Sequence, residues 1–77
     1  MYKDLVEYLI KSLVSDADKV LVTETEAKDR RIITVKVDSE DMGRVIGKDG
    51  RIIKSIREIV RAYSAKNGEK VSVDIEE

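Results

Sequence analysis

Apolar residues in the first half of the chain follow first a helical spacing and then patterns typical of strands. The N-terminal apolar residues recur three and four positions apart, as on one face of a helix, and we predict a helix over residues 2–15. Residues 19–26 are rich in β-branched side chains, and residues 33–37 alternate apolar and polar positions. We therefore predict two strands, which the short polar connection 27–30 would join as a hairpin.

The second half predicts two more helices and a last strand. Ser39, followed by two acidic residues, is typical of a capped helix start, and we expect a short helix over residues 40–46. A glycine-containing break precedes a longer helix over residues 51–66, which Asn67-Gly68 would end with a left-handed cap. Residues 71–76 alternate like a strand with one packed side. The expected fold class is α+β, in the order α-β-β-α-α-β.

One face of the longer predicted helix is expected to enter the core. At 100° per residue, six large side chains fall within an arc of about 120°. They are Ile52, Ile53, Ile56, Ile59, Val60 and Tyr63.

Length and composition restrict the class of protein. The 77 residues form one small domain, 1–77, whose limited core would benefit from an oligomeric partner. The chain has no Cys and no His, so we expect no disulfide, no metal, no cofactor and no enzyme mechanism. We find neither an apolar run of about 18 residues nor a signal-like leader, so we expect a cytoplasmic protein without membrane insertion.

The net charge of −1 conceals an uneven distribution. Residues 43–66 contain seven basic and two acidic side chains, a local balance of +5, whereas the other segments together carry −6. This polarity favours a local site for an anion over general adhesion to anions. The alternative is a basic helix face that serves only to contact water.

The glycines at positions 43, 47 and 50 lie between the two predicted helices. Their spacing differs from the nucleotide-binding loop G-x-x-x-x-G-K-[ST], and they follow a helix, unlike the dinucleotide fingerprint G-x-G-x-x-G. Gly47 and Gly50 permit a tight turn at the start of the longer helix, where an anion is favoured and Lys48 adds a mobile positive charge. The loop therefore indicates phosphate recognition, although two glycines could equally form a corner between helices.

The stretch from Asp41 to Ile53 resembles the V-I-G-x-x-G-x-x-I signature of the KH domain. It reads Asp41-Met42-Gly43-Arg44-Val45-Ile46-Gly47-Lys48-Asp49-Gly50-Arg51-Ile52-Ile53. The predicted element order resembles the type II, prokaryotic arrangement, and the whole chain is similar to small stand-alone bacterial KH proteins of the KhpA type. The resemblance implies a three-stranded sheet with the helices packed on one face, and a GXXG loop that clamps about four nucleotides of single-stranded RNA.

The resemblance also implies roles in the loop. Gly47 and Gly50 would let the nucleic-acid backbone approach, and Lys48 would contact phosphate. Asp49 would either weaken binding slightly or cap the following helix. Arg44 and Arg51, which flank the loop, would be secondary contacts.

Three apolar residues beside the loop have two interpretations. We expect Ile46 to pack in the core, whereas Val45 or Ile53 could line an apolar groove beneath unstacked bases.

Lys54, Arg57 and Arg61 are expected on the arc opposite the isoleucine stripe. A solvated back face is the favoured interpretation, and a second electrostatic contact with nucleic acid is the alternative. The chain has no Phe or Trp on which bases could stack, so we expect weak, backbone-led binding that depends on salt. The same signature would also accept single-stranded DNA.

Relatives of this type imply an RNA chaperone that acts as a homodimer, or as a heterodimer with a KhpB-like KH protein, and influences cell elongation and cell-wall homeostasis. Dimerisation would raise the effective concentration of a weak site. The alternative is a protein–protein interaction subunit in which the glycine loop is only a corner.

Overall fold

The computed structural model describes residues 2–76 and confirms the predicted element order. The helices are α1 (Tyr2–Lys11), α2 (Met42–Ile46) and α3 (Arg51–Lys66). The strands are β1 (Leu21–Glu26), β2 (Arg31–Lys36) and β3 (Val71–Glu76). Three single 3₁₀ turns join these elements, over residues 17–19, 39–41 and 48–50.

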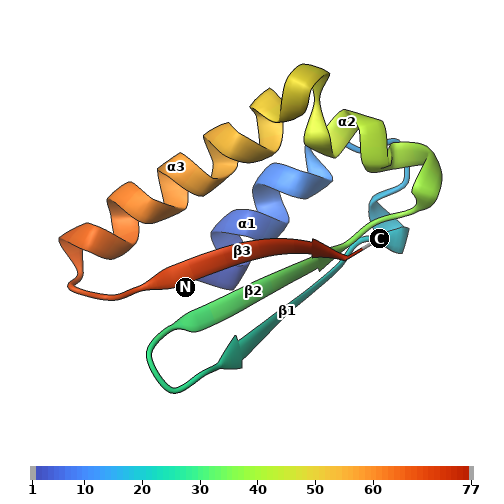
Figure 1. The fold of residues 1–77 in the computed structure, drawn as a ribbon. Coiled ribbons are helices and arrows are strands. Elements are labelled where there is room, and N and C mark those ends of the chain that lie inside the picture. The colour runs from blue at the N-terminus through green and yellow to red at the C-terminus, as the bar shows by residue number, and fades with distance from the viewer. Residues whose placement is uncertain (1, 77) are drawn as a thin grey trace.

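The three strands form one mixed sheet in the order β1-β2-β3. β1 and β2 are antiparallel, with Val22 opposite Val35, whereas β2 and β3 run parallel, with Ile33 opposite Val73. Helices α1 and α3 lie on the same side of this sheet, and α2 lies beyond one end of it (Figure 1). The expected three-stranded sheet with its helices on one face is therefore confirmed.

The core lies between the sheet and the helices. β2 contributes the fully buried Ile33 and Val35, α1 contributes Val6 and Ile10, and α3 contributes Ile56 among others. The buried residues recur with a period of about 3.6 in the helices and of 2 in the strands, so the apolar periodicity of the sequence corresponds to the faces that pack together.

The first helix is shorter than predicted because its end is drawn into a turn. The backbone N–H of Leu13 donates to the carbonyl of Ile10, and the Ser12 hydroxyl donates to the carbonyl of Tyr8. Ser15 is then bonded to Asp41, 26 residues along the chain. The tertiary contact replaces the helical one, so residues 12–15 do not belong to α1.

Strand and cap boundaries also differ from prediction. Residues 17–19 form a turn, so β1 begins at Leu21, and β2 begins two residues before the predicted 33. Ser39 does not cap α2: it begins a 3₁₀ turn, and Asp41 occupies the residue before α2 without a side-chain capping bond. The predicted left-handed cap of α3 is confirmed by Gly68, whose φ is +69°.

Helix α3 presents a different face to the core from the one predicted. Its buried residues are Ile53, Ile56, Val60 and Ser64, whereas Ile59 is 48% exposed and Tyr63 is 38% exposed. At 100° per residue the centre of the buried arc has moved by about 40°. The carbonyl of Ser64 accepts the Glu69 N–H at 2.9 Å, which ties this small residue to the chain entering β3.

Candidate nucleic-acid interface

The loop between α2 and α3 has an unusual backbone. Gly47, Asp49 and Gly50 all have positive φ, at +78°, +57° and +73°. Such values are unfavourable for residues with a Cβ atom, and aspartate is among those that tolerate them best. The Gly50 N–H donates to the Gly47 carbonyl at 3.2 Å, which closes the turn. The loop is therefore a defined structure with consecutive left-handed residues.

The two glycines of this loop meet different surroundings. A Cβ atom at Gly47 would lie 2.6 Å from the Ile52 side chain, whereas a Cβ at Gly50 would meet nothing within 4 Å. Gly47 is required by packing within the protein. Gly50 instead leaves an open side on which another molecule can approach the backbone.

The loop also marks the start of the 16-residue helix α3. Gly50 is the residue before α3 and no side chain caps this end, so the expected capping role of Asp49 is wrong. The partial positive charge of a helix N-terminus favours an anion here. Lys48, at the tip of the loop, and Arg51, in the first turn of α3, are both exposed.

Within residues 2–76, the basic side chains of segment 43–66 form almost no ion pairs with acidic side chains. Arg44 lies 3.9 Å from Asp41, the only ion pair that involves a basic residue of segment 43–66 within residues 2–76. The other basic side chains of the segment are Lys48, Arg51, Lys54, Arg57, Arg61 and Lys66. Elsewhere Lys11, Lys19, Arg30 and Arg31 all have acidic partners. The positive segment is therefore available to an external anion.

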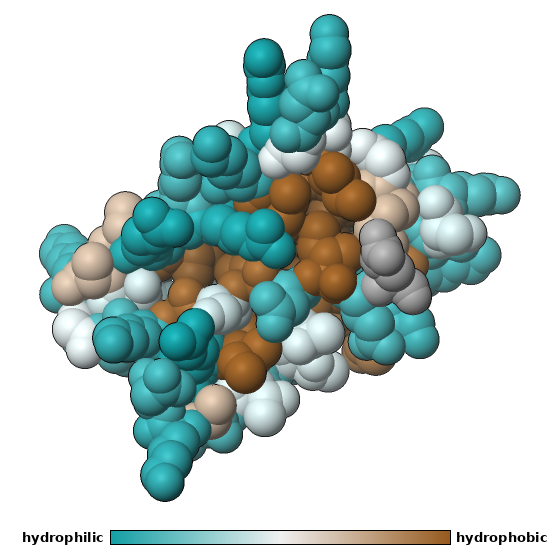
Figure 2. Space-filling view, in the orientation of Figure 1, coloured by the Kyte–Doolittle hydropathy of each residue, from teal (hydrophilic) through white to brown (hydrophobic). Residues whose placement is uncertain are grey.

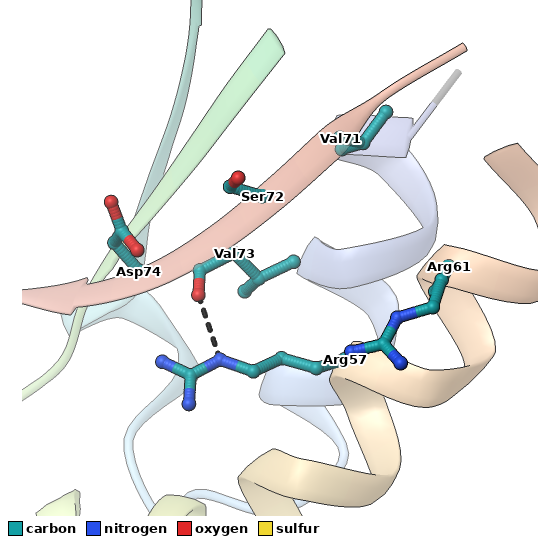
Figure 3. A pocket seen from close by; sticks show the side chains of 6 residues that line it. All are labelled: Arg57, Arg61, Val71, Ser72, Val73 and Asp74. Atoms are coloured by element: carbon teal, nitrogen blue, oxygen red, sulfur yellow. Dashed lines mark hydrogen bonds between the residues drawn. The ribbon is translucent and has the colours of Figure 1, made fainter. Parts of the chain in front are cut away.

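A groove between α3 and the edge strand β3 continues from this segment. It has a volume of about 240 Å³ and is lined by Arg57 and Arg61 of α3 and by residues 71–74 of β3. The Nε of Arg57 donates to the Val73 carbonyl at 2.9 Å, as Figure 3 shows. This bond satisfies a strand-edge carbonyl and leaves the terminal NH₂ groups of the guanidinium without a partner among residues 2–76.

Arg57 and Arg61 are therefore not on a back face, contrary to the favoured interpretation of the sequence. Because the buried arc of α3 is turned away from Ile59 and Tyr63, these arginines border the core on the β3 side. On the face seen in Figure 2, apolar side chains lie between α3 and the sheet and hydrophilic ones surround them. The groove is thus lined by two arginines from α3 and, from β3, by Val71, Ser72, Val73 and the acidic Asp74.

Two other expectations about the loop are corrected. Val45 is fully buried and Ile53 is 6% exposed, so both belong to the core and neither lines a groove for bases. Ile46, expected in the core, is half-buried and packs against it. Ile52, predicted on the core face of the longer helix, has its side chain beneath Gly47, a contact that the sequence did not indicate.

Asp41 supports the loop from the other end of α2. Its carboxylate is 2% exposed and accepts hydrogen bonds from the Ser15 N–H at 3.1 Å and the Ser15 hydroxyl at 2.9 Å. The backbone hydrogen bond from Ser15 is the main cause that lowers the pKa of Asp41. The sequence singled out Asp41 only as an acid at a helix start and as part of the signature-like stretch, and neither signal indicated its bond to Ser15. Asp41 thus anchors α2 to the connection between α1 and β1.

These elements define a type II KH domain: the order α-β-β-α-α-β, a mixed three-stranded sheet and a GXXG loop between two helices. The model of the KH domain of KhpA/KhpB matches residues 3–75, and the chain belongs to this family.

Curated relatives match along almost their full length. The RNA-binding protein KhpA of Clostridium perfringens is 48% identical over 73 residues, which cover 95% of this chain and 97% of the relative. The protein of the same name from Aquifex aeolicus is 44% identical over 73 residues, with 95% and 92% covered. That from Listeria monocytogenes is 40% identical over 73 residues, with 95% and 96% covered.

A solved structure supports the fold independently. A crystal structure of Era from Aquifex aeolicus aligns with a TM-score of 0.61 at 19% identity, covering 96% of this chain and 29% of that one. No helix within residues 2–76 is both long and apolar enough to span a membrane.

Proposed function

We propose that this chain binds single-stranded RNA without catalysing a reaction. The observation that carries the proposal is a positive-φ loop with an open glycine, Gly50, at the uncapped start of α3, whose cations have no acidic partner in the part of the chain that the structure describes. The relatives named RNA-binding protein KhpA support the choice of ligand. In this arrangement Lys48 binds phosphate at the loop, and Arg44 and Arg51 reinforce the positive field.

The groove continues the path of the bound strand. Phosphates held at the loop direct the strand along α3, where Arg61 and the NH₂ groups of Arg57, which have no side-chain partner among residues 2–76, line the groove. The groove is lined mainly by polar groups, and the chain has no Phe or Trp on which bases could stack strongly. Recognition is therefore led by the backbone, tolerates many sequences and would also accept single-stranded DNA.

The direct test is fluorescence anisotropy of a labelled single-stranded RNA at two salt concentrations. Lys48→Asp should weaken binding at least about tenfold and reduce the log–log salt slope by about 0.7 for one lost phosphate contact. Lys3→Asp is the matched control, because Lys3 is an exposed residue at the far end of α1 and should leave affinity within about twofold. Equal binding by wild type and Lys48→Asp, with both folded by circular dichroism, would contradict the proposal.

A second function, pairing with another KH chain, is favoured by the opposite flank of α3. An apolar hollow of about 640 Å³ is lined by Leu5, Ile59, Ala62, Tyr63 and the stem of Lys66. Ile59 and Tyr63 lie on the side of α3 away from Arg57 and Arg61, so a second copy bound there leaves both grooves open. We propose a homodimer, which joins two weak RNA sites and raises their effective concentration.

Sedimentation equilibrium tests this pairing. Ile59→Glu should give a monomer that still binds a short RNA, whereas Glu58→Gln on the neighbouring exposed position should remain dimeric. A wild-type monomer would contradict the homodimer and point to a heterodimer with a KhpB-like chain. The resemblance to KhpA-type proteins further leads us to propose a cytoplasmic RNA-chaperone role with effects on cell elongation and the cell wall.

A further inference from the structure

The groove between α3 and β3 does not end at Arg61. Arg61 also lines a second hollow of about 350 Å³, together with Arg30, Ser64, Glu69, Lys70 and Ser72. Val71 and Ser72 line both hollows, so the two are continuous along the edge of β3. The second hollow therefore carries the groove past the end of α3 to the hairpin between β1 and β2.

Arg30 reaches this hollow from a distant part of the chain. It belongs to the β1–β2 connection, yet its Nη1 donates to the Ser72 hydroxyl at 3.1 Å across 42 residues of sequence. The Arg31 N–H donates to the Lys70 carbonyl at 2.9 Å, and the Ala27 N–H to the Arg30 carbonyl at 2.8 Å. These bonds hold the hairpin against the start of β3, so the Arg30 guanidinium is placed in advance of any ligand.

The acids around the hollow are already engaged. Glu69 lies 3.4 Å from Arg31 Nε, and Asp29 lies 3.4 Å from Arg30 Nη2, which lowers the pKa of Asp29. Arg61 and Lys70, by contrast, form no ion pair within residues 2–76. The hollow therefore presents a positive surface, and a guanidinium fork is well suited to the oxygens of a phosphate.

We infer that the RNA site extends beyond the nucleotides held at the loop, with Arg30, Arg61 and Lys70 binding phosphates of a longer strand at the hairpin end. This inference rests on the proposed RNA-binding function. Arg61 lies about 15 Å along α3 from Arg51, given a rise of 1.5 Å per residue. A KH loop clamps about four nucleotides, so the hairpin end is positioned for those that follow.

Competition titrations of oligo(U) tetramer and octamer, at low salt, test the extension. An octamer offers about five registers to a four-nucleotide clamp, so wild type should prefer the octamer by clearly more than about fivefold. Replacing two of these three cations, by Arg30→Gln with Lys70→Gln, should remove most of this excess and reduce the octamer salt slope by about 1.4, leaving tetramer affinity unchanged. Lys28→Gln, an exposed change in the same connection and outside the hollow, is the matched control.

The outcomes separate this inference from the function on which it rests. If wild type prefers the octamer by only the roughly fivefold factor expected from the number of registers, while Lys48→Asp weakens binding of both oligomers, the extension is wrong and the loop site stands. If Lys48→Asp leaves the affinity for the tetramer unchanged, RNA clamping by the loop is wrong, and the extension fails with it. Melting curves of the variants should lie close to that of wild type, because Arg30 and Lys70 are exposed and the backbone bonds of Ala27 and Arg31 that hold the hairpin remain.

Discussion

Helix α2 is only five residues long, and the polar residues that flank its two ends differ in their partners. At the N-terminal end, Asp41 is buried and accepts both hydrogen bonds of Ser15. At the C-terminal end, Lys48 and Asp49 are exposed and form no ion pair within residues 2–76. A polar group with internal partners serves the fold, whereas an exposed charge without them is available to a ligand.

The largest expected effect is a loss of stability on substitution of Gly47, which follows the C-terminal end of α2 and serves the fold rather than the ligand. Gly47→Ala would place a Cβ 2.6 Å from Ile52 at a φ of +78°. Strain and overpacking together should lower the free energy of unfolding by about 3 kcal/mol, measured by urea denaturation. Gly43→Ala is the control, because its Cβ meets nothing within 4 Å in a helix, and it should stabilise by up to about 1 kcal/mol. Equal stabilities would show that Ile52 yields to the new methyl group.

Asp41, at the N-terminal end of α2, should make the stability of the protein depend on pH in the acid range. Because hydrogen bonds lower the folded-state pKa of Asp41 below its ordinary 3.8, its stabilising contribution is complete above about pH 5 and declines as pH falls through the lowered pKa. Urea midpoints at pH 3 and pH 7 should therefore differ less for Asp41→Asn than for wild type.

Asp29→Asn controls for this acid effect. The Asp29 pKa is also lowered, by the hydrogen bond and charge of Arg30, but the side chain is 66% exposed and its ion pair should contribute little. If the urea midpoint of Asp41→Asn depended on pH as strongly as that of wild type, the Asp41 carboxylate would not be the group that stabilises this end of α2.

Gly50→Ala should separate folding from binding at the open side of the loop. Its left-handed conformation makes alanine unfavourable by about 1 kcal/mol, less than at Gly47 because no atom opposes the methyl group. RNA affinity should fall as well, because the methyl group occupies the side open to a nucleic-acid backbone. Gly50→Asn, which tolerates this conformation better, should recover stability but not affinity in parallel unfolding and anisotropy measurements.

The smallest effect is expected from the acid at the loop tip. Asp49→Asn keeps a residue type that tolerates a φ of +57° and removes the negative charge next to Lys48. RNA should bind about two- to fivefold more tightly, with unchanged stability. Weaker binding in the same anisotropy assay would mean that the Asp49 carboxylate accepts a bond from the RNA.

Much of the site could be predicted because it is local in sequence. The loop residues 47–50 and their flanking arginines are consecutive, so a motif places them together whatever the packing. The groove was missed because the position of Arg57 depends on which face of α3 is buried. Periodicity gives six candidate core residues but does not decide that Ser64 is buried in place of Ile59.

The sequence by itself determined the element order, the glycine loop, the cap at Gly68 and the positive segment 43–66, because each follows from local backbone preferences or from neighbouring charges. Only the tertiary structure decided which cations line the groove, that Val45 is core, and that Ser15 ends α1 by bonding to Asp41. It also brought Arg30 to Ser72. These outcomes depend on contacts between segments tens of residues apart, where burial and hydrogen bonding override local preference.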